Sequence, residues 1–420
     1  MERRDIRPRE GWESRIEQQG LIYWKTPLAN GEVISYWHEG AYYALSSTEV
    51  YEFEAAARVL LNDLLVPAGD FMIEHNLFAR MGIPGWAVDR IKETWESEPP
   101  MLYGRFDFAY GPDGVPKLLE YNADTPTCLL ETAIQWHWAT DVFGEDADQW
   151  NSVHEALVAR WKEMAEAGRL PGNTVHFLHT NEERSGEDFM TVAYLVETCR
   201  DSGLLNPVIL PVESLGWHQT FGFLDLDGAP VRNAFKLYPW EWMVHERYSA
   251  QAMSRMGTGG GMTQWIEPIW KMLWSNKGIL PVLWHLFPDH PNLLPAYFEH
   301  DFGDSGGPVP VDVFGEPVGA LDWGGNVVRK PLLAREGANS QIVLAGNVVE
   351  AGPQQDYGEE GFVVQQYTDL GQYGEAGARP VMGVWTVDME PVGLGIRESD
   401  NFITNNESRF VPHIIDTDLI

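Results

Sequence analysis

Four polar side chains within residues 103–127 have the types and the spacing of a chemical site. They are Arg105, Asp107, Glu120 and Asn122. Two alternating apolar runs flank Gly111-Pro112-Asp113-Gly114, a pattern that predicts a β-hairpin with a tight turn. Because side chains alternate between the two faces of a strand, all four polar groups are expected on one face. If Gly111 pairs with Gly114, Arg105 lies opposite Glu120 and Tyr103 lies opposite Asn122.

Two interpretations of this polar face are open. Carboxylates and a carboxamide suit a hard cation, which takes oxygen ligands from a few side chains and from substrate phosphates. The alternative is a solvated hairpin face with a cross-strand Arg–Glu pair. The next residues, Asp124-Thr125-Pro126-Thr127, resemble a helix start. Backbone N–H groups there would either bind an anionic ligand or serve ordinary helix capping.

Basic residues are scarce in this chain, so a cation inside an apolar or glycine-containing segment is informative. The 420 residues include 29 Lys and Arg against 62 Asp and Glu, which gives a net charge of −33. Lys277 lies in Ser275-Asn276-Lys277-Gly278, and Lys330 lies in an apolar strand before a short loop that contains Gly337. A lysine followed by loop amides can hold nucleotide phosphates. The alternative is an edge-strand lysine that discourages aggregation.

Two further segments could recognise a nucleotide base or a second substrate. Gln365, Gln366 and Tyr367 end an apolar strand, where amides and an aromatic ring can read an adenine; a strand end without such a role is the alternative. Arg397 is a lone cation in a predicted strand, and its guanidinium could bind a substrate carboxylate through two hydrogen bonds. The alternative for Arg397 is an ion pair with Glu398 or another acid.

The composition argues against several classes of function. A surface this acidic repels phosphate backbones and anionic membranes, so we expect no nucleic-acid or membrane partner. The charge would attract a cationic ligand such as an amine; the alternative is that it serves only solubility. The charged N-terminus lacks the apolar stretch of a signal peptide, and only Cys128 and Cys199 are present, which favours a reducing cytoplasm. The histidines are dispersed without a zinc motif, and no Gly-x-Ser-x-Gly elbow occurs.

The remaining pattern predicts a mixed α/β (α+β) fold that positions these side chains. Ser46-Ser47-Thr48-Glu49 fits a capping box before a helix over residues 50–65. Residues 175–214 have a β-α-β rhythm that predicts a small α/β layer. From residue 362 onward, alternating runs predict a sheet.

Taken together, these segments resemble the glutathionylspermidine synthase family of ATP-grasp-type C–N ligases. The strongest motif is Gly104-Arg105-Phe106-Asp107 followed by Leu119-Glu120-Tyr121-Asn122-Ala123-Asp124-Thr125-Pro126-Thr127, supported in order by the segments around Lys277, Lys330, Gln365 and Arg397. The resemblance implies an ATP-grasp-like synthetase with mixed and antiparallel sheets, a small α/β substrate subdomain and a mobile lid. It implies one unit over residues 1–420, with approximate parts 1–170, 171–265 and 266–420 and a lid near residues 300–360.

The resemblance also implies roles for individual residues. Asp107, Glu120 and Asn122 resemble the family's Mg²⁺ ligands, and Arg105 the arginine that stabilises the transferring phosphoryl group. The ATP contacts would be Lys277, Lys330, Gly337, Gln365 and Gln366. The substrate contacts would be Thr125, Thr127 and Arg397 for a peptide, and Glu187 and Asp188 for an amine.

The expected activity is therefore an ATP- and Mg²⁺-dependent ligation of a small peptide or amino-acid carboxylate to an amine through an acyl phosphate. Three departures limit the match. First, the chain begins at the synthetase part, so amidase activity is not expected. Second, residues 379–381 contain no glutamine that could make the family's nucleotide contact. Third, only some of the family's peptide-binding residues are present. Glutathione and spermidine are thus not assumed. The alternatives are an ATP-binding sensor or scaffold without turnover, and an acidic interaction protein without catalysis.

Overall fold

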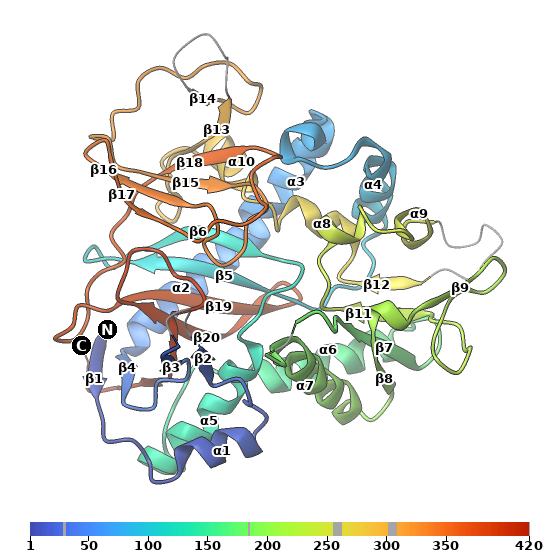
Figure 1. The fold of residues 1–420 in the computed structure, drawn as a ribbon, viewed down its shortest axis with the longest axis horizontal. Helices are drawn as coiled ribbons and strands as arrows, with labels where there is room; N and C mark the ends of the chain where they lie inside the picture. The colour runs from blue at the N-terminus through green and yellow to red at the C-terminus, as the bar shows by residue number, and fades with distance from the viewer. Residues whose placement is uncertain (28–30, 184, 255–262, 301–308, 420) are drawn as a thin grey trace.

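The chain folds into several sheets with helices packed against them, which confirms the expected mixed α/β class. A computed structural model describes residues 1–27, 31–183, 185–254, 263–300 and 309–419. Figure 1 shows a central sheet, a second sheet above it and a smaller α/β part beside both. None of the helices in these ranges combines the length and the apolar character needed to cross a membrane.

The central antiparallel sheet contains the predicted hairpin. Its strands in spatial order are β21 (Arg409–Val411), β20 (Glu390–Ser399), β19 (Arg379–Val387), β5 (Tyr103–Tyr110) and β6 (Pro116–Asn122). The predicted register is wrong: Arg105 pairs with Asn122, and Asp107 pairs with Glu120. A bulge between Asp107 and Phe108 leaves Leu119 without a partner and shifts the pairing.

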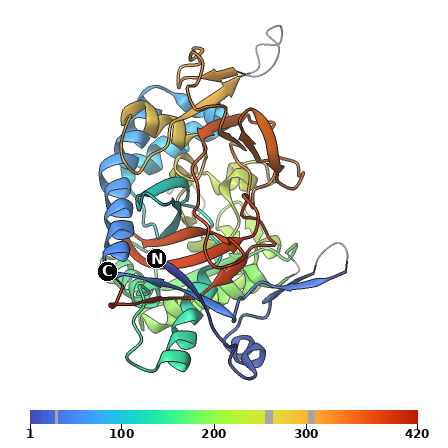
Figure 2. The same cartoon turned by 90° about the vertical axis from the view of Figure 1, so that its left-hand side faces the viewer.

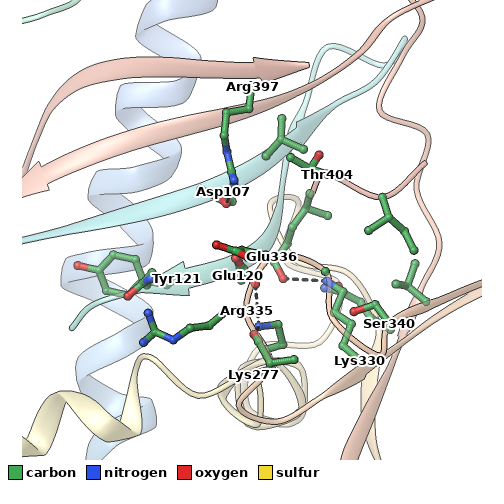
Figure 3. Close-up of a pocket in the computed structure, with 18 of the residues that line it drawn as sticks. Asp107, Glu120, Tyr121, Lys277, Lys330, Arg335, Glu336, Ser340, Arg397 and Thr404 are labelled. Atoms are coloured by element: carbon green, nitrogen blue, oxygen red, sulfur yellow. Dashed lines mark hydrogen bonds and ion pairs between the residues drawn. The ribbon is translucent and has the colours of Figure 1, made fainter. Parts of the chain in front are cut away.

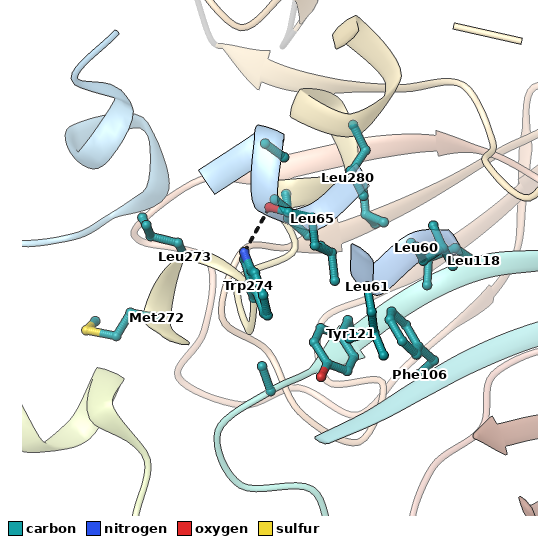
Figure 4. Close-up of a cluster of buried hydrophobic side chains, with 14 of the residues drawn as sticks. Leu60, Leu61, Leu65, Phe106, Leu118, Tyr121, Met272, Leu273, Trp274 and Leu280 are labelled. Carbon is teal, nitrogen blue, oxygen red and sulfur yellow. Dashed lines mark hydrogen bonds between the residues drawn. The ribbon is translucent and has the colours of Figure 1, made fainter. Parts of the chain in front are cut away.

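A long helical segment covers one face of the central sheet (Figures 1 and 2). It runs through α2 (Ser47–Val59), a π-helical turn (Leu60–Leu65) and α3 (Val66–Glu74), and it starts at the predicted capping box of Ser46 and Glu49. The apolar side of the hairpin packs here, where the rings of Phe106 and Tyr121 stack with centroids 4.0 Å apart. Trp274 joins this core and donates from Nε1 to the Leu65 carbonyl at 3.1 Å (Figure 4). The polar side of the hairpin therefore faces the other way.

The second large sheet is antiparallel and lies above the hairpin in Figure 1. Its strands in spatial order are β14 (Val309–Val311), β13 (Ala296–His300), β18 (Phe362–Gln366), β15 (Val327–Pro331), β16 (Gln341–Leu344) and β17 (Asn347–Ala351). Strand β15 is an interior strand, so Lys330 is not an edge-strand lysine. The predicted lid near residues 300–360 falls on this sheet, although residues 301–308 lie outside the described part of the chain.

The small α/β part contains a parallel sheet, as the β-α-β rhythm predicts. Its strands in spatial order are β12 (Gln264–Ile266), β11 (Asn233–Lys236), β7 (Thr174–His179) and β8 (Asn206–Pro211). Helices α6 (Val153–Glu166) and α7 (Glu187–Asp201) pack against each other. The division of the chain near residues 170 and 265 stays a prediction.

Shorter elements complete the described fold. The helices are α1 (Trp12–Gln18), α4 (Val88–Ser97), α5 (Leu129–Phe143), α8 (Trp240–Met243), α9 (Ser249–Ala252) and α10 (Ile279–Leu286). A three-stranded sheet joins β1 (Glu2–Asp5), β4 (Ala41–Leu45) and β22 (His413–Ile415), so the two chain ends lie close together in Figure 1. Two-stranded sheets join β2 (Lys25–Pro27) with β3 (Val33–Ser35), and β9 (Gly216–His218) with β10 (Gly222–Leu224).

A buried ion pair places the exit of the hairpin. Lys236 donates from Nζ to Asp124 Oδ1 at 2.6 Å, and the Trp240 amide donates to Asp124 Oδ2 at 2.8 Å. Asp124 therefore does not cap α5. The predicted helix start at residues 124–127 is wrong, because α5 begins at Leu129 after Cys128, whose φ is +68°.

A second buried ion pair places the start of the hairpin. Glu267 accepts hydrogen bonds from the backbone amides of Leu102 and Tyr103. Lys271 lies 2.5 Å from the Glu267 carboxylate and also donates to the Tyr103 carbonyl at 2.8 Å. Both charged side chains are almost fully buried, so each depends on the other to compensate its charge.

Replacing Lys271 with methionine is expected to lower the free energy of unfolding by about 3–5 kcal/mol, because Glu267 would be left as an unpaired buried charge. Urea denaturation followed by circular dichroism would measure the change. Lys162→Met is the matched control, since Lys162 forms an exposed pair with Glu166 at 3.9 Å and its loss should cost under about 1 kcal/mol. Equal midpoints for the two variants would contradict the assigned role of Lys271.

Candidate active site

A deep pocket lies between the polar face of the hairpin and the second sheet (Figure 3). Its cavity volume is about 220 Å³. All but two of the sequence-predicted site residues line it, namely Arg105, Asp107, Glu120, Asn122, Thr125, Thr127, Lys277, Lys330, Gly337, Gln365, Gln366 and Arg397. Residues separated by almost three hundred positions therefore meet in one cavity, while the roles predicted for them stay predictions.

Asp107 lies between two arginines. Arg105 donates from Nε to Asp107 Oδ1 at 2.6 Å and from Nη2 to Asp107 Oδ2 at 3.0 Å. Arg397 donates from Nη2 to the same Oδ2 atom at 3.0 Å. The side chains of Arg105 and Asp107 are only 6% and 5% exposed, which excludes the solvated-face interpretation for this pair. Arg397 pairs with Asp107 and not with Glu398, which binds Arg3 on the other side.

Glu120 forms the second charged centre of the pocket. Its Oε2 atom lies 3.0 Å from Lys277 Nζ, and Figure 3 shows both side chains pointing into the cavity. Burial alone would raise the pKa of the Glu120 carboxyl, but the charges of Lys277 and Lys330 outweigh this and lower the pKa to about 2. Glu120 is therefore ionised throughout the physiological range.

Lys330 is held by the bulge that shifts the hairpin register. It donates from Nζ to the carbonyl of the unpaired Leu119 at 3.1 Å and to Gln365 Oε1 at 2.8 Å. Gln365 in turn donates from Nε2 to the Leu118 carbonyl at 3.1 Å. Burial lowers the pKa of Lys330 to about 8, with the charge of Lys277 acting in the same direction and Glu120 opposing it.

The donor set of the pocket suits a hard cation. Asp107 and Glu120 offer carboxylate oxygens and Asn122 offers a carboxamide oxygen, which here accepts a hydrogen bond from the Thr125 amide at 3.1 Å. In the described residues, no group of three or more His, Cys, Asp or Glu side chains is placed to hold a metal ion. Two carboxylates with an amide fit Mg²⁺ in particular, because Mg²⁺ keeps several waters and takes its other ligands from substrate phosphates.

A loop over residues 332–340 lies along the pocket and contributes residues that the sequence did not single out. Arg335 donates from Nη2 to Glu241 Oε1 at 2.7 Å and to Thr125 Oγ1 at 2.8 Å, so it joins the second sheet to the small α/β part and the hairpin. The loop packs so closely that a Cβ at Gly337, whose φ is +69°, would lie 2.4 Å from Ile403 Cγ2. Arg335 follows Lys330 closely in sequence, which is the signal that could have identified it.

The far end of the pocket is aromatic and apolar. Gln366 and Tyr367 line it together with Phe402, and the rings of Tyr367 and Phe402 meet edge to face with centroids 6.3 Å apart. The Thr404 hydroxyl is buried, has no hydrogen-bond partner among the residues that the structure describes, and belongs to the pocket lining. No motif marks Phe402 or Thr404 in the sequence, so only the fold places them here.

Glu187 and Asp188 do not line the pocket. They begin α7, near Glu131, whose buried carboxylate accepts a hydrogen bond from the Tyr36 hydroxyl at 2.5 Å. Burial, followed by the charges of Glu131 and Asp188, raises the pKa of Glu187 to about 8. Burial and the charge of Glu183 raise the pKa of Asp188 to about 6. These crowded carboxyls therefore disfavour further negative charge and would favour a cation.

Glu187→Gln is expected to stabilise the ligand-free protein in a pH-dependent way. In the wild type, ionisation of Glu187 is favoured in the unfolded chain above pH about 4.3 but in the folded protein only above pH about 8. Folded-state stability is thus lost as the pH rises through this window, whereas the glutamine variant keeps it.

Thermal melting between pH 4 and pH 9 should show an advantage for Glu187→Gln that grows up to pH about 8 and then levels off. Glu197→Gln, an exposed position on the same helix, is the control for the change in net charge. An equal gain in melting temperature from both variants would contradict the crowded, buried environment assigned to Glu187.

Comparison with known proteins agrees with the expected resemblance. A predicted acid–amine ligase of Haemophilus influenzae is 34% identical over 402 residues, covering 94% of each chain. A trypanothione synthetase of Crithidia fasciculata is 28% identical over 86% of this chain, and a bifunctional glutathionylspermidine synthetase/amidase of Escherichia coli is 26% identical over 68%. The match covers only 52% and 49% of the length of these two relatives.

The fold and the family model agree with this result. The solved structure of a glutathione synthetase-like effector from Globodera pallida has the same fold, with a TM-score of 0.54 at 9% identity over 96% of this chain and 98% of that chain. The expected ATP-grasp-type synthetase fold is thereby confirmed. The family model for the glutathionylspermidine synthase preATP-grasp family matches residues 3–416. The chain therefore belongs to this family of ATP-dependent ligases that form amide bonds.

Proposed function

We propose that this protein is an ATP- and Mg²⁺-dependent carboxylate–amine ligase that works through an acyl phosphate. One observation supports this above all: Asp107 and Glu120 lie among Arg105, Arg397, Lys277 and Lys330 in a single pocket. Phosphoryl transfer needs little covalent chemistry from a protein and much neutralisation of charge around the transferring group. This pocket concentrates cations for that purpose in an otherwise strongly acidic chain.

In the proposed complex, Lys277 and Lys330 bind the ATP phosphates. Gln366, which lines the aromatic end of the pocket, and the neighbouring Gln365 recognise the adenine, and the loop containing Gly337 supplies backbone amides to the phosphates. Asp107, Glu120 and Asn122 would hold Mg²⁺, which supplies neutralisation of the phosphate charge when bound. Arg105 stabilises the transferring phosphoryl group. Its hydrogen bonds to Asp107 and to the Thr127 carbonyl fix the position of the guanidinium, which supports this role.

The acid substrate is proposed to bind beside Arg105. Arg397 takes its carboxylate, and Thr125 and Thr127 contact the rest of a small peptide or amino acid. A carboxylate oxygen attacks the γ-phosphorus, and ADP leaves. The amine nitrogen then attacks the carbonyl carbon of the acyl phosphate, loses a proton and expels phosphate. The loop over residues 332–340, held by Arg335, would keep water from the acyl phosphate.

The amine is proposed to approach from the side of Glu187 and Asp188. The raised pKa values of these carboxyls support this direction of approach, because a nearby cation would stabilise their ionised forms. The relatives include proteins named for trypanothione and glutathionylspermidine synthesis. A peptide-like acid and a polyamine-like amine are therefore the first classes of compound to test.

A mass-spectrometric screen would test this function. The purified protein is incubated with ATP, Mg²⁺ and pooled peptide acids and amines, and products are sought whose mass equals acid plus amine minus water. The proposal expects at least one amide product that requires ATP. ATP binding without any product would favour a nucleotide sensor or scaffold, and absence of ATP binding would favour an interaction protein.

Arg105→Ala is expected to reduce turnover by about 10²–10³-fold while leaving ATP affinity within about threefold, because the arginine acts on the transferring group. Turnover is measured from amide product or ADP release, and affinity by calorimetry. Arg15→Ala removes an exposed arginine and is the control, with turnover unchanged. Normal turnover in Arg105→Ala would remove Arg105 from the mechanism.

ATP affinity is expected to fall above pH about 8. Lys330 has a pKa of about 8 in the ligand-free pocket, and only its protonated form attracts phosphate. Affinity should be constant below this pH and then decrease by up to tenfold per pH unit. In Lys330→Arg the charge persists at high pH, so the decrease should disappear. A flat wild-type profile between pH 7 and pH 10 would contradict the combination of a phosphate contact and a lowered pKa at Lys330.

A further inference from the structure

Asp107 and Arg397 each have two competing uses in the pocket. Asp107 Oδ2 accepts hydrogen bonds from both Arg105 and Arg397 at 3.0 Å. Under the proposed function, a metal ion needs this carboxylate, and the acid substrate needs Arg397. The ion pair between the two residues therefore competes with the binding of the metal ion and of the acid substrate.

The two arginines differ in how firmly they are held. Arg105 donates to both oxygens of Asp107 and to the Thr127 carbonyl, its side chain is 6% exposed, and its guanidinium lies 5.7 Å from the centre of the Trp385 ring. Within the described part of the chain, Arg397 donates one hydrogen bond, to Asp107, and its side chain is 18% exposed. Arg397 is therefore the partner that Asp107 can lose.

We propose that Arg397 is an exchange residue that couples the acid site to the metal-nucleotide site. Without acid, Arg397 pairs with Asp107 and opposes a metal ion there. When a substrate carboxylate binds, Arg397 turns to it, and Asp107 Oδ2 keeps only its hydrogen bond from Arg105, which leaves room for the metal on this oxygen. This inference rests on the proposed function and adds an order of binding to it. The acid binds first and thereby makes Asp107 available to the metal ion.

Electrostatics supports the exchange. Asp107 is buried, so charges around it interact more strongly than they would in water. A divalent cation at this carboxylate would lie close to two guanidinium groups, and removal of one of them relieves a substantial repulsion. The incoming carboxylate replaces the negative partner that Arg397 gives up, so neither charge is left buried and unpaired.

The coupling has a functional consequence. Because coupling between two binding sites is reciprocal, the acid raises the affinity for the metal-nucleotide by the same factor as the metal-nucleotide raises the affinity for the acid. A protein without acid would hold the metal and the nucleotide weakly. ATP would then be protected from phosphoryl transfer to water until a carboxylate is in place.

Binding of Mn²⁺·ADP tests the exchange without a known substrate. Mn²⁺ is followed by electron paramagnetic resonance in the absence of any acid. Arg397→Gln and, as a variant that keeps more of the packing, Arg397→Met are expected to bind Mn²⁺·ADP about tenfold more tightly than the wild type. Arg409→Gln is the matched control, because Arg409 lies on the neighbouring strand with the same charge but contacts Glu398 and Asp400. It should bind as the wild type does.

A double-mutant cycle separates local exchange from general electrostatics. In an Asp107→Asn background, Arg397→Gln should bring no further gain in Mn²⁺·ADP affinity, since the carboxylate that Arg397 blocks is absent. Unchanged or weaker binding by both Arg397 variants would overturn the exchange while leaving the proposed function in place. A wild type that binds no Mn²⁺·ADP, with or without added acids, would overturn both.

Discussion

A buried carboxylate on the central hairpin is the feature on which the site depends. Asp107 is 5% exposed, and an isolated carboxylate at that depth would be neutralised or would destabilise the fold. Two hydrogen bonds from Arg105 and one from Arg397 compensate its charge. The hairpin can therefore bring a carboxylate into the centre of the protein only because β5 supplies one arginine and β20 supplies the other. Glu120, which is more exposed than Asp107, pairs with Lys277 in the segment before α10.

The apolar side of the same hairpin explains how these charges are held in place. Phe106 and Tyr121 alternate with the polar residues and pack against the helical segment of α2 and α3 (Figure 4). The buried pairs of Asp124 with Lys236, and of Glu267 with Lys271, fix the exit and the start of the hairpin. The bulge at Leu119 then turns two backbone carbonyls toward Lys330 and Gln365. Packing, ion pairs and a local irregularity together join the central sheet to the second sheet.

Much of this arrangement could be predicted from local pattern, and the failures have identifiable causes. Alternation placed Arg105, Asp107, Glu120 and Asn122 on one face correctly, and the resemblance brought Lys277, Lys330 and Arg397 to it. The register failed because a bulge leaves no clear trace in the pattern of apolar residues. The helix start at residues 124–127 failed because Asp124 binds Lys236, a partner far along the chain. Phe402 and Thr404 reach the pocket through tertiary folding alone, whereas the nearness of Arg335 to Lys330 in the sequence could have identified it; Glu187 and Asp188 lie outside the lining.

The most direct measurement is an experimental structure with Mg²⁺, a non-hydrolysable ATP analogue and an acid substrate identified by the product screen. The account predicts phosphates between Lys277 and Lys330, the base beside Tyr367 and Phe402, and the metal ion on Asp107, Glu120 and Asn122. Nucleotide bound elsewhere, or bound here while the pairs of Asp107 with Arg397 and of Glu120 with Lys277 stay intact and no metal ion touches the carboxylates, would contradict it.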